Sequence, residues 1–377
     1  MLSMASPRSA IRDAHRVVVK IGSSSITAPQ GGIDSYRLQA LSTVLAKRCL
    51  AGGQMLLVSS GAIAAGMTPL GLTRRPKDLA TQQAAASAGQ GNLMAAYTTA
   101  FHLHGLTVGQ VLLTADDTHR RSHYVNASRT LERLLELEVV PIINENDTVA
   151  TEEIRFGDND RLAALVAQLI KADALVLLSD VDGLYTGHPR EPDSERIGVV
   201  SSPEQIADVH ITAPGSKVGS GGMVTKVAAA QMCATEGIPV VLTSADQAAQ
   251  ALAGEDVGTL FEPTGSPKNA RRRWLAHATH VNGRLILDRG AVEAVVKRQT
   301  SLLPVGVTRI EGVFHAGDTV DLCDPQGEVV ARGLVGYDSD ELGGLVGRRL
   351  DTDRMNHARA RGSGVRTVIR RDDLVVL

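Results

Sequence analysis

Short apolar runs rich in β-branched residues alternate with longer segments of helical periodicity from Arg16 to about Phe261. This alternation is typical of βα units, in which helices cover both faces of a buried and mainly parallel sheet. We expect strands at residues 17–21, 55–59, 108–113, 139–143, 174–179 and 239–243. The pattern predicts an α/β domain, and in such domains ligands bind at the carboxyl ends of the strands.

Three of the intervening segments carry clear helix signals. Asp34 is a predicted N-cap for a helix that ends at Gly52–Gly53. An alanine-rich helix is predicted from Asp78 to Leu103, and a further one at 126–138. All three are expected to pack on the sheet as core helices.

The texture of the chain changes after Phe261. Residues 263–277 contain Pro263, Gly265 and Pro267, followed by three consecutive arginines at 271–273, which is typical of an interdomain linker. Brief strand-like runs and one helical stretch follow, separated by turn signals; we expect strands at 284–287, 319–322 and 329–331 and the helix at 291–298. The sequence therefore predicts a large α/β domain at 15–262 and a small β-rich domain with a C-terminal tail at 278–377.

Composition excludes several classes of protein. Lys and Arg (39) nearly balance Asp and Glu (41), so the chain lacks the uniform positive field of a general nucleic-acid binder. Three widely separated cysteines, Cys49, Cys233 and Cys323, form neither a disulfide framework nor a clustered zinc site. No run approaches the roughly 20 apolar residues that span a bilayer, and no apolar stretch of a signal peptide follows Met1. We expect a cytoplasmic protein.

The first predicted strand ends by delivering Lys20, followed by Gly22 and three serines that begin with Ser23. A lysine within a Val/Ile strand is unfavourable unless a negative partner neutralises it. At the carboxyl end of a strand, such a lysine can meet a ligand phosphate. Taken alone, Lys20 could equally extend from the strand end into solvent.

A second small-residue segment, from Ser59 through Ser60 and Gly61 to Gly66, directly follows a predicted strand. Gly61 and Gly66 have the glycine spacing of a Walker A loop, but its lysine is missing, which rejects a P-loop ATPase. The remaining interpretation is a strand that enters a helix N-terminus suited to an anion. A close packing turn between strand and helix also explains the small residues, but not the paired serines.

Two polar tetrads lie in one βα region. Asn144-Glu145-Asn146-Asp147 follows a predicted strand, and Gly157-Asp158-Asn159-Asp160 precedes a predicted helix. Such residues are common in turns, and either Asn159 or Asp160 could simply cap the helix. Because two tetrads occur at the ends of strands, we favour recognition of a cationic amine and of a polar substrate.

Two further segments carry phosphate-binding features. Ser179 and Asp180 leave another predicted strand, and the glycine-rich run from Gly219 enters a helix that contains Lys226. Glycines allow backbone amides to approach phosphate oxygens, although a flexible surface loop is also rich in glycine. Neither segment matches the dinucleotide fingerprint of dehydrogenases. Two lysines, several anion sites and a carboxamide-rich pocket together favour phosphoryl transfer, which requires positioning and charge neutralisation.

These segments resemble the amino acid kinase family, and within it the branch that phosphorylates glutamate. The resemblance covers roughly residues 15–262 and rests on motifs that occur in the family's order. They are Val-Lys-Ile-Gly-Ser (19–23), Ser-Ser-Gly-Ala-Ile-Ala-Ala-Gly (59–66), Asn-Glu-Asn-Asp (144–147), Gly-Asp-Asn-Asp (157–160) and Gly-Gly-Met-Val-Thr-Lys (221–226). The remainder resembles a PUA domain, a small module often found in RNA-modifying enzymes. The implied fold is a three-layer sandwich around a mainly parallel sheet, followed by a PUA-like domain.

The resemblance also implies a reaction: transfer of the γ-phosphoryl group of ATP, with Mg²⁺, to the side-chain carboxylate of L-glutamate. That reaction is the first step of proline biosynthesis, so proline is an expected feedback inhibitor, and a homo-oligomer is expected. In this reading Lys20 and Lys226 flank the phosphates, Gly61 supplies an amide, and Asp160 orients the lysines. The residues expected to hold glutamate are Ser60, Asn144, Asp147 and Asn159. The residues expected to line the ATP side are Lys20, Gly22, Ser23, Ser179, Asp180, Ser220, Gly221, Gly222, Met223, Val224, Thr225 and Lys226. No metal ligand is identified.

Two alternatives stay open. Another amino acid kinase, acting on acetylglutamate or aspartate, would share most of these motifs, although the two Asn/Asp tetrads argue against it. An RNA-binding protein would use the C-terminal domain and the arginines at 271–273, although the nearly balanced charge argues against it.

Overall fold

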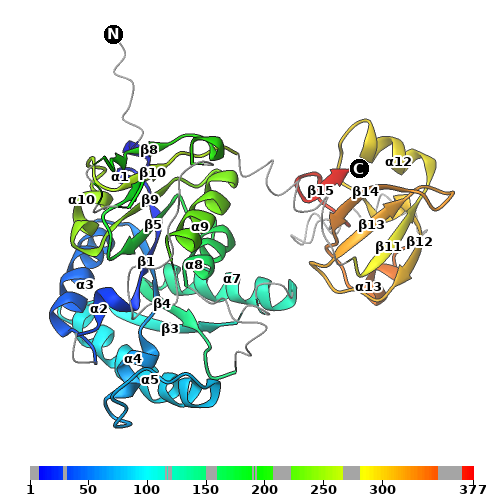
Figure 1. Cartoon of the computed structure of the whole chain (residues 1–377). Coiled ribbons are helices and arrows are strands. Elements are labelled where there is room, and N and C mark those ends of the chain that lie inside the picture. The colour runs from blue at the N-terminus through cyan, green and yellow to red at the C-terminus, as the bar shows by residue number, and fades with distance from the viewer. Residues whose placement is uncertain are drawn as a thin grey trace. The chain divides into compact units, whose positions relative to one another are not determined.

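The computed structural model describes residues 8–28, 32–114, 117, 121–149, 159–188, 191, 193–206, 222–265, 281–346 and 367–377. The chain divides into two compact units, Met1–Gly265 and Ser266–Leu377. The first unit is an α/β domain and the second a small β-rich domain, as predicted (Figure 1).

An eight-stranded sheet forms the centre of the first unit, in the order β3-β4-β2-β1-β5-β9-β10-β8. Six strands are parallel and match the predicted ones: β1 (Arg16–Ile21), β2 (Gln54–Ser59), β3 (Thr107–Leu113), β4 (Val139–Glu145), β5 (Ala174–Ser179) and β9 (Val240–Ser244). Two short strands at the edge were not predicted. β10 (Thr259–Phe261) pairs antiparallel to β9, and β8 (Val199–Val200) pairs with β10.

Two helical layers cover this sheet (Figure 1). One core contains Val17, Val19 and residues of α3 (Ser35–Leu50), α4 (Ala62–Met67), α5 (Leu79–His102) and α10 (Ala248–Leu252). The opposite core contains Val18 and residues of α7 (Arg121–Glu136), α8 (Asn159–Leu169) and α9 (Met223–Thr235). Successive side chains of a strand point to opposite faces, so Lys20 shares the face of Val18, towards α8 and α9.

Several predicted helix signals are confirmed. The Asp34 carboxylate accepts a hydrogen bond from the amide of Arg37, and Asp78 caps α5 through the amide of Thr81. The third helix begins at Arg121, five residues before the predicted start at 126. Its polar first turn lacks the apolar periodicity on which the prediction depended. Short elements complete the unit: α1 (Ser9–Arg12), α2 (Ser23–Ile26) and the hairpin of β6 (Leu184–Tyr185) with β7 (Arg196–Ile197).

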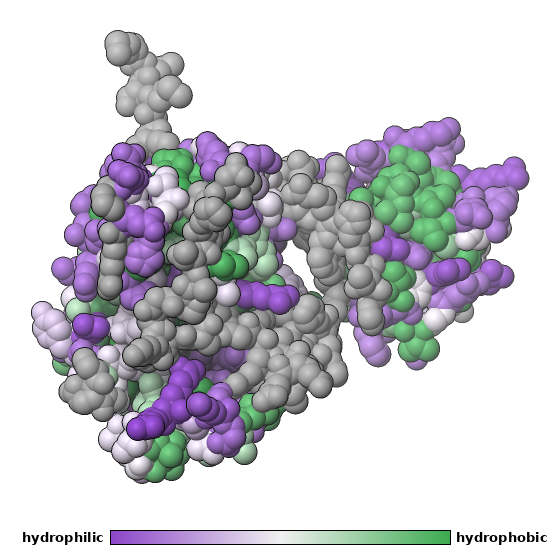
Figure 2. Space-filling view, in the orientation of Figure 1, coloured by the Kyte–Doolittle hydropathy of each residue, from purple (hydrophilic) through white to green (hydrophobic). Residues whose placement is uncertain are grey.

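The second unit contains a five-stranded sheet in the order β12-β11-β13-β14-β15. Its strands and helices are β11 (Gly283–Leu287), α12 (Arg289–Val296), β12 (Val307–Gly312), β13 (Thr319–Cys323), β14 (Val329–Leu334), α13 (Ser339–Gly343) and β15 (Leu374–Val376). Leu285, Val320 and Leu322 belong to its separate hydrophobic core. Apolar residues also gather on the visible surface of this unit in the region of α12 (Figure 2). Within the described ranges, every helix is too short or too polar to span a bilayer.

Helices α4 and α5 cross at two glycines, Gly66 and Gly89. A Cβ on Gly66 would lie 1.8 Å from the carbonyl oxygen of Ala85, and a Cβ on Gly89 would lie 1.9 Å from that of Ala62. Both contacts are to backbone atoms, which cannot rotate away. Gly66 is therefore required for the packing of α4 against α5, whereas the sequence had suggested packing between the strand and the helix that follows it.

We expect Gly89→Ala to lower the free energy of unfolding by about 1–3 kcal/mol or more, since overpacking forces the backbones apart. Gly91→Ala, two residues along the same helix, is the matched control because a Cβ there meets nothing within 4 Å. The control should gain about 0.5–1 kcal/mol, as alanine is the better helix former. Denaturant unfolding measures both, and equal midpoints for the two variants would contradict the close crossing.

Candidate active site

The candidate site lies at the carboxyl ends of four neighbouring strands, β4, β2, β1 and β5. Lys20 is the penultimate residue of β1 and is in register with Val58 of β2 and Leu177 of β5. Ser59 ends β2, and its neighbour Ser60 donates its backbone N–H to the carbonyl oxygen of Ile21 at 3.2 Å. β1 has β2 on one side and β5 on the other, so the strand order reverses at β1. That is the position at which open α/β sheets bind ligands.

Lys20, Asp160 and Lys226 meet in one buried cluster. The Nζ of Lys20 lies 2.5 Å from Oδ1 of Asp160, and the Nζ of Lys226 lies 3.1 Å from Oδ2. The side chains of the three residues are 3%, 0% and 9% exposed, in the order Lys20, Asp160, Lys226. Thr225 also donates its hydroxyl to Oδ2 of Asp160, at 3.1 Å. Two lysines some two hundred positions apart thus converge on one carboxylate.

This cluster carries a net positive charge, because two ammonium groups share one carboxylate. Burying a charge is costly unless the surroundings neutralise it. An arriving oxyanion at about 4 Å from one ammonium would gain about 4 kcal/mol at an effective dielectric constant of 20, before desolvation. The three side chains together are therefore suited to bind an anion.

Beside the cluster, carboxamide and hydroxyl groups form a hydrogen-bonded network. The Nδ2 of Asn159 lies within hydrogen-bond distance of the Ser59 carbonyl oxygen, Oγ of Ser60 and Oδ1 of Asn144, at 3.1, 2.9 and 2.9 Å. Its two hydrogens are shared among these three acceptors. Asn144 in turn donates to Oε1 of Gln90, on α5, at 2.9 Å. Asn159 and Asp160 are the first two residues of α8, and both side chains reach the site. Their contacts exceed what simple helix capping would require.

Tyr97, on α5, contacts the last residue of β2. Its hydroxyl lies 2.8 Å from Oγ of Ser59, and its side chain is fully buried. Burial raises the pKa of Tyr97, a change that the Ser59 hydrogen bond only partly offsets, so the hydroxyl stays protonated. A neutral Tyr97 therefore holds Ser59 without adding charge to the site.

Gly61 forms the turn between β2 and α4 with a φ of 107°. Residues with a Cβ rarely adopt this conformation, and a Cβ here would also lie 3.2 Å from Cδ1 of Ile26. On the other side, a Cβ on Gly22 would lie 3.9 Å from Nζ of Lys20. Gly22 therefore lies directly beside the lysine, and Ser23 begins the short helix α2.

Apart from Lys20, Gly22 and Ser23, the described residues predicted for the ATP side lie at the end of β5 and at the start of α9. The hydroxyl of Ser179, the last residue of β5, donates to Oδ1 of Asp180 at 3.0 Å. Gly222 caps α9, after which Met223 packs against the core and the side chain of Val224 is 54% exposed. Asp147 lies partly buried in the turn after β4. Ser220 and Gly221 lie outside the described residues.

Sequence reasoning missed Gln90 and Tyr97. Both lie on the helix predicted only as a core element, and both reach the strand ends through hydrogen bonds. The available signal for Gln90 was its polar side chain, which directly follows the buried residues Ala85, Ala86 and Gly89 of α5.

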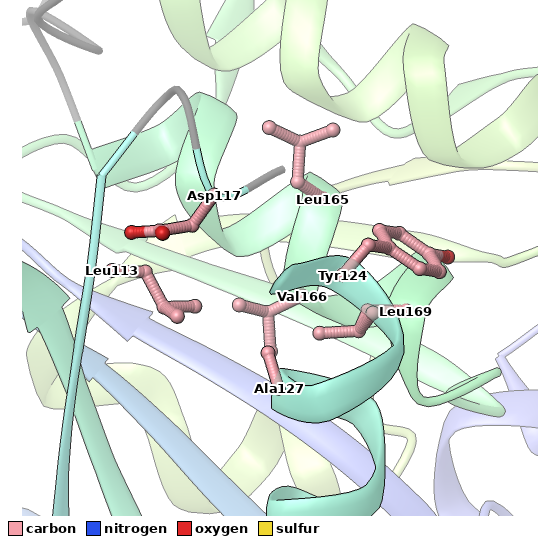
Figure 3. A pocket seen from close by; sticks show the side chains of 7 residues that line it. All are labelled: Leu113, Asp117, Tyr124, Ala127, Leu165, Val166 and Leu169. Atoms are coloured by element: carbon pink, nitrogen blue, oxygen red, sulfur yellow. The ribbon is translucent and has the colours of Figure 1, made fainter. Parts of the chain in front are cut away.

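A small pocket of different character lies between β3, α7 and α8 (Figure 3). Leu113, Ala127, Leu165, Val166 and Leu169 line it, together with Tyr124 and Asp117. The Tyr124 hydroxyl points away from the centre of the pocket in Figure 3. Apart from Asp117 and Tyr124 this lining is apolar, and it contains none of the residues predicted for the site.

Comparison with known proteins identifies the family of this chain. The sequence profile of the amino acid kinase family matches residues 15–244, and that of the PUA domain matches residues 283–351. Glutamate 5-kinase of Salinispora arenicola is 59% identical over 372 residues, covering 98% of this chain and 100% of its own. Glutamate 5-kinases of Streptomyces avermitilis and Nocardia farcinica are 56% and 52% identical, each over 99% of this chain and 100% of their own.

Among solved structures, UMP kinase from Bacillus anthracis is similar over 67% of this chain and 97% of its own, with 13% identity and a TM-score of 0.46. The assignment depends instead on the family profile and on the nearly full-length relatives. The chain belongs to the amino acid kinase family and, within it, to the glutamate 5-kinases.

Proposed function

We propose that this chain transfers the γ-phosphoryl group of ATP to the side-chain carboxylate of L-glutamate, giving L-glutamyl 5-phosphate. The observation that carries this proposal is the convergence of Lys20 and Lys226 on Asp160 at the carboxyl ends of the central strands. Phosphoryl transfer requires donor and acceptor held in line, and positive charge around the transferring group. Two buried ammonium groups supply that charge.

Asp160 acts as an orienting group in this mechanism. Each of its oxygens holds one lysine, so the two ammonium groups are fixed on either side of it. A general base is not needed, because the glutamate side chain is already ionised at neutral pH and has no proton to lose. Lys20 and Lys226 would neutralise the charge that spreads over the phosphoryl oxygens, and the amide of Gly61 would add a hydrogen bond.

Glutamate would bind at the carboxamide network. Asn159 directs its Nδ2 into the protein, which leaves its Oδ1 without a hydrogen-bond partner in the described part of the chain. That oxygen is suited to accept from the substrate's α-ammonium, with Asp147 as the charged partner. Ser60 and Asn144 complete the set, while Ser179, Asp180 and residues 220–226 would line the nucleotide.

Mg²⁺ would be held chiefly by the nucleotide. Among the described residues, no group of three or more His, Cys, Asp or Glu side chains is arranged to hold a metal ion. Mg²⁺ commonly keeps several waters and binds substrate phosphates together with only one or two carboxylates. Such an ion would supply positive charge at the nucleotide phosphates in addition to that of Lys20 and Lys226.

Purified protein with Mg-ATP should release ADP only when L-glutamate is present, and hydroxylamine should trap the acyl phosphate as a hydroxamate. L-Glutamine is the matched control, since its side-chain amide lacks the anionic oxygen that attacks the phosphoryl group. N-Acetylglutamate and L-aspartate test the other amino acid kinases. ADP release that is independent of glutamate, or faster with either analogue, would reject the proposal.

Three other expectations have a different basis. Inhibition by proline and a homo-oligomeric state follow from the resemblance, and a cytoplasmic location follows from the composition. Proline added to the same assay tests the first of these. RNA binding through the C-terminal unit is a separate hypothesis, and the arginines at 271–273 that it would use lie outside the described residues.

A further inference from the structure

We propose that Gln90 is a positioning residue for the amino acid substrate: it holds Asn144, and through it Asn159, in the orientation that recognises glutamate. This inference rests on the proposed function, since it concerns the substrate side of the same site. Gln90 lies on α5, and the hydrogen bonds that carry the inference run from α5 through β4 to α8.

Two backbone groups fix the direction of this network. The Ser59 carbonyl oxygen can only accept, so the group of Asn159 that faces it must be the Nδ2 donor, at 3.1 Å. The backbone N–H of Glu145 can only donate, so Asn144 must turn its Oδ1 towards it, at 2.9 Å. The same Oδ1 accepts from Asn159. Neither amide can be reversed without placing two donors or two acceptors face to face.

The orientation of Gln90 follows from these anchors. With its Oδ1 committed to Glu145 and Asn159, Asn144 directs its Nδ2 to Gln90, which must present Oε1 as the acceptor, at 2.9 Å. Gln90 therefore turns its Nε2 away from Asn144. That Nε2 is buried and has no hydrogen-bond partner among the described residues.

An unsatisfied buried donor opposes folding, because the group loses its water without gaining a partner. The position of Gln90 is nevertheless tightly set. It follows Gly89, which crosses α4 in backbone contact with Ala62 and Gly66. The fold therefore holds Gln90 at a fixed position although its unpaired Nε2 lowers the stability of the protein. A role in stability alone does not explain a glutamine here. What Gln90 provides is one acceptor oxygen that locks Asn144 beside Asn159 and Ser60.

Gln90→Met keeps the length of the side chain and removes both the acceptor and the unpaired donor. We expect the KM for glutamate to rise about threefold to tenfold, which corresponds to the loss of one neutral hydrogen bond. The KM for ATP and kcat should change by less than about twofold, and the melting temperature should stay equal or rise. Gln82→Met is the matched control on the same helix. The Gln82 amide donates to the carbonyl oxygens of Pro76 and Lys77, just before α5, and these residues lie outside the network of Asn144 and Asn159.

A double-mutant cycle with Asn144→Ala separates positioning from direct contact. If Gln90 acts through Asn144, Gln90→Met should change the KM for glutamate by less than about twofold in the Asn144→Ala background. Asn144→Ser replaces Asn144→Ala if the alanine variant does not fold. If the increases in the KM for glutamate caused by the two substitutions multiplied in the double variant, Gln90 would act on the substrate independently of Asn144. This result would overturn the inference.

Two other results would also overturn it: an unchanged KM for glutamate in Gln90→Met, or a parallel rise in both KM values together with a lower melting temperature. The wild-type assay keeps the two proposals apart. If the wild-type protein shows no glutamate-dependent ADP release, the proposed function is rejected. If the wild type is active and Gln90→Met has an unchanged KM for glutamate, only the positioning role is rejected.

Discussion

Lys226→Met is expected to lower kcat with Mg-ATP and L-glutamate by about 10²–10³-fold, the usual cost of removing one preorganised group that stabilises transition-state charge. Methionine keeps much of the apolar length of the side chain and removes only the ammonium group. Folding should be little affected, because Lys20 still lies 2.5 Å from the Asp160 carboxylate. Steady-state ADP release and thermal unfolding measure the two effects.

Lys47→Met serves as the control for this substitution. Lys47 lies exposed on α3 and takes no part in the cluster, so its replacement should leave both kcat and the melting temperature unchanged. If Lys226→Met retained more than about a tenth of wild-type kcat, charge stabilisation by this lysine would be far smaller than such groups usually provide.

Asp160→Asn should produce the largest loss of stability of any substitution in the site, about 3–5 kcal/mol, the usual cost of removing one partner from a buried ion pair. Asp160 is completely buried, and its carboxylate is shared by Lys20 and Lys226. Asparagine keeps the shape but leaves two buried ammonium groups without that carboxylate. The melting temperature should fall by roughly 6–20 °C, and activity should be lost because the lysines are no longer held.

Two measurements connect this loss to charge. Removing Lys20 as well, in Lys20→Met/Asp160→Asn, should recover part of the stability, since one buried ammonium group disappears. Added pyrophosphate should raise the melting temperature of Asp160→Asn more than that of the wild type. Asp246→Asn, at an exposed position, is the control for an aspartate-to-asparagine change. A wild-type melting temperature for Asp160→Asn would show that the carboxylate does not stabilise the cluster.

Five of the six parallel strands, β1, β2, β4, β5 and β9, could be predicted because they are buried on both faces and read as continuous apolar runs. β3, at the edge of the sheet, is partly exposed along most of its length. The β5 prediction agrees with the structure at both ends, and the other five differ by one or two residues. β8 and β10 were missed because they contain only two and three residues, too few for any periodicity. In the small unit, β12 was missed because exposed residues such as Thr308 and Arg309 interrupt its apolar pattern.

The residues that carry charge and amide groups at the ends of strands could be predicted from the sequence, because strand ends and helix starts are local features. The sequence also identified the family, since the motifs occur in one order along the chain. The folded chain was needed to show that Lys20 and Lys226 share Asp160, and that Gln90 reaches Asn144. Those contacts join segments far apart in the chain. Which of them form depends on strand order and helix packing, and no local pattern of residues encodes either.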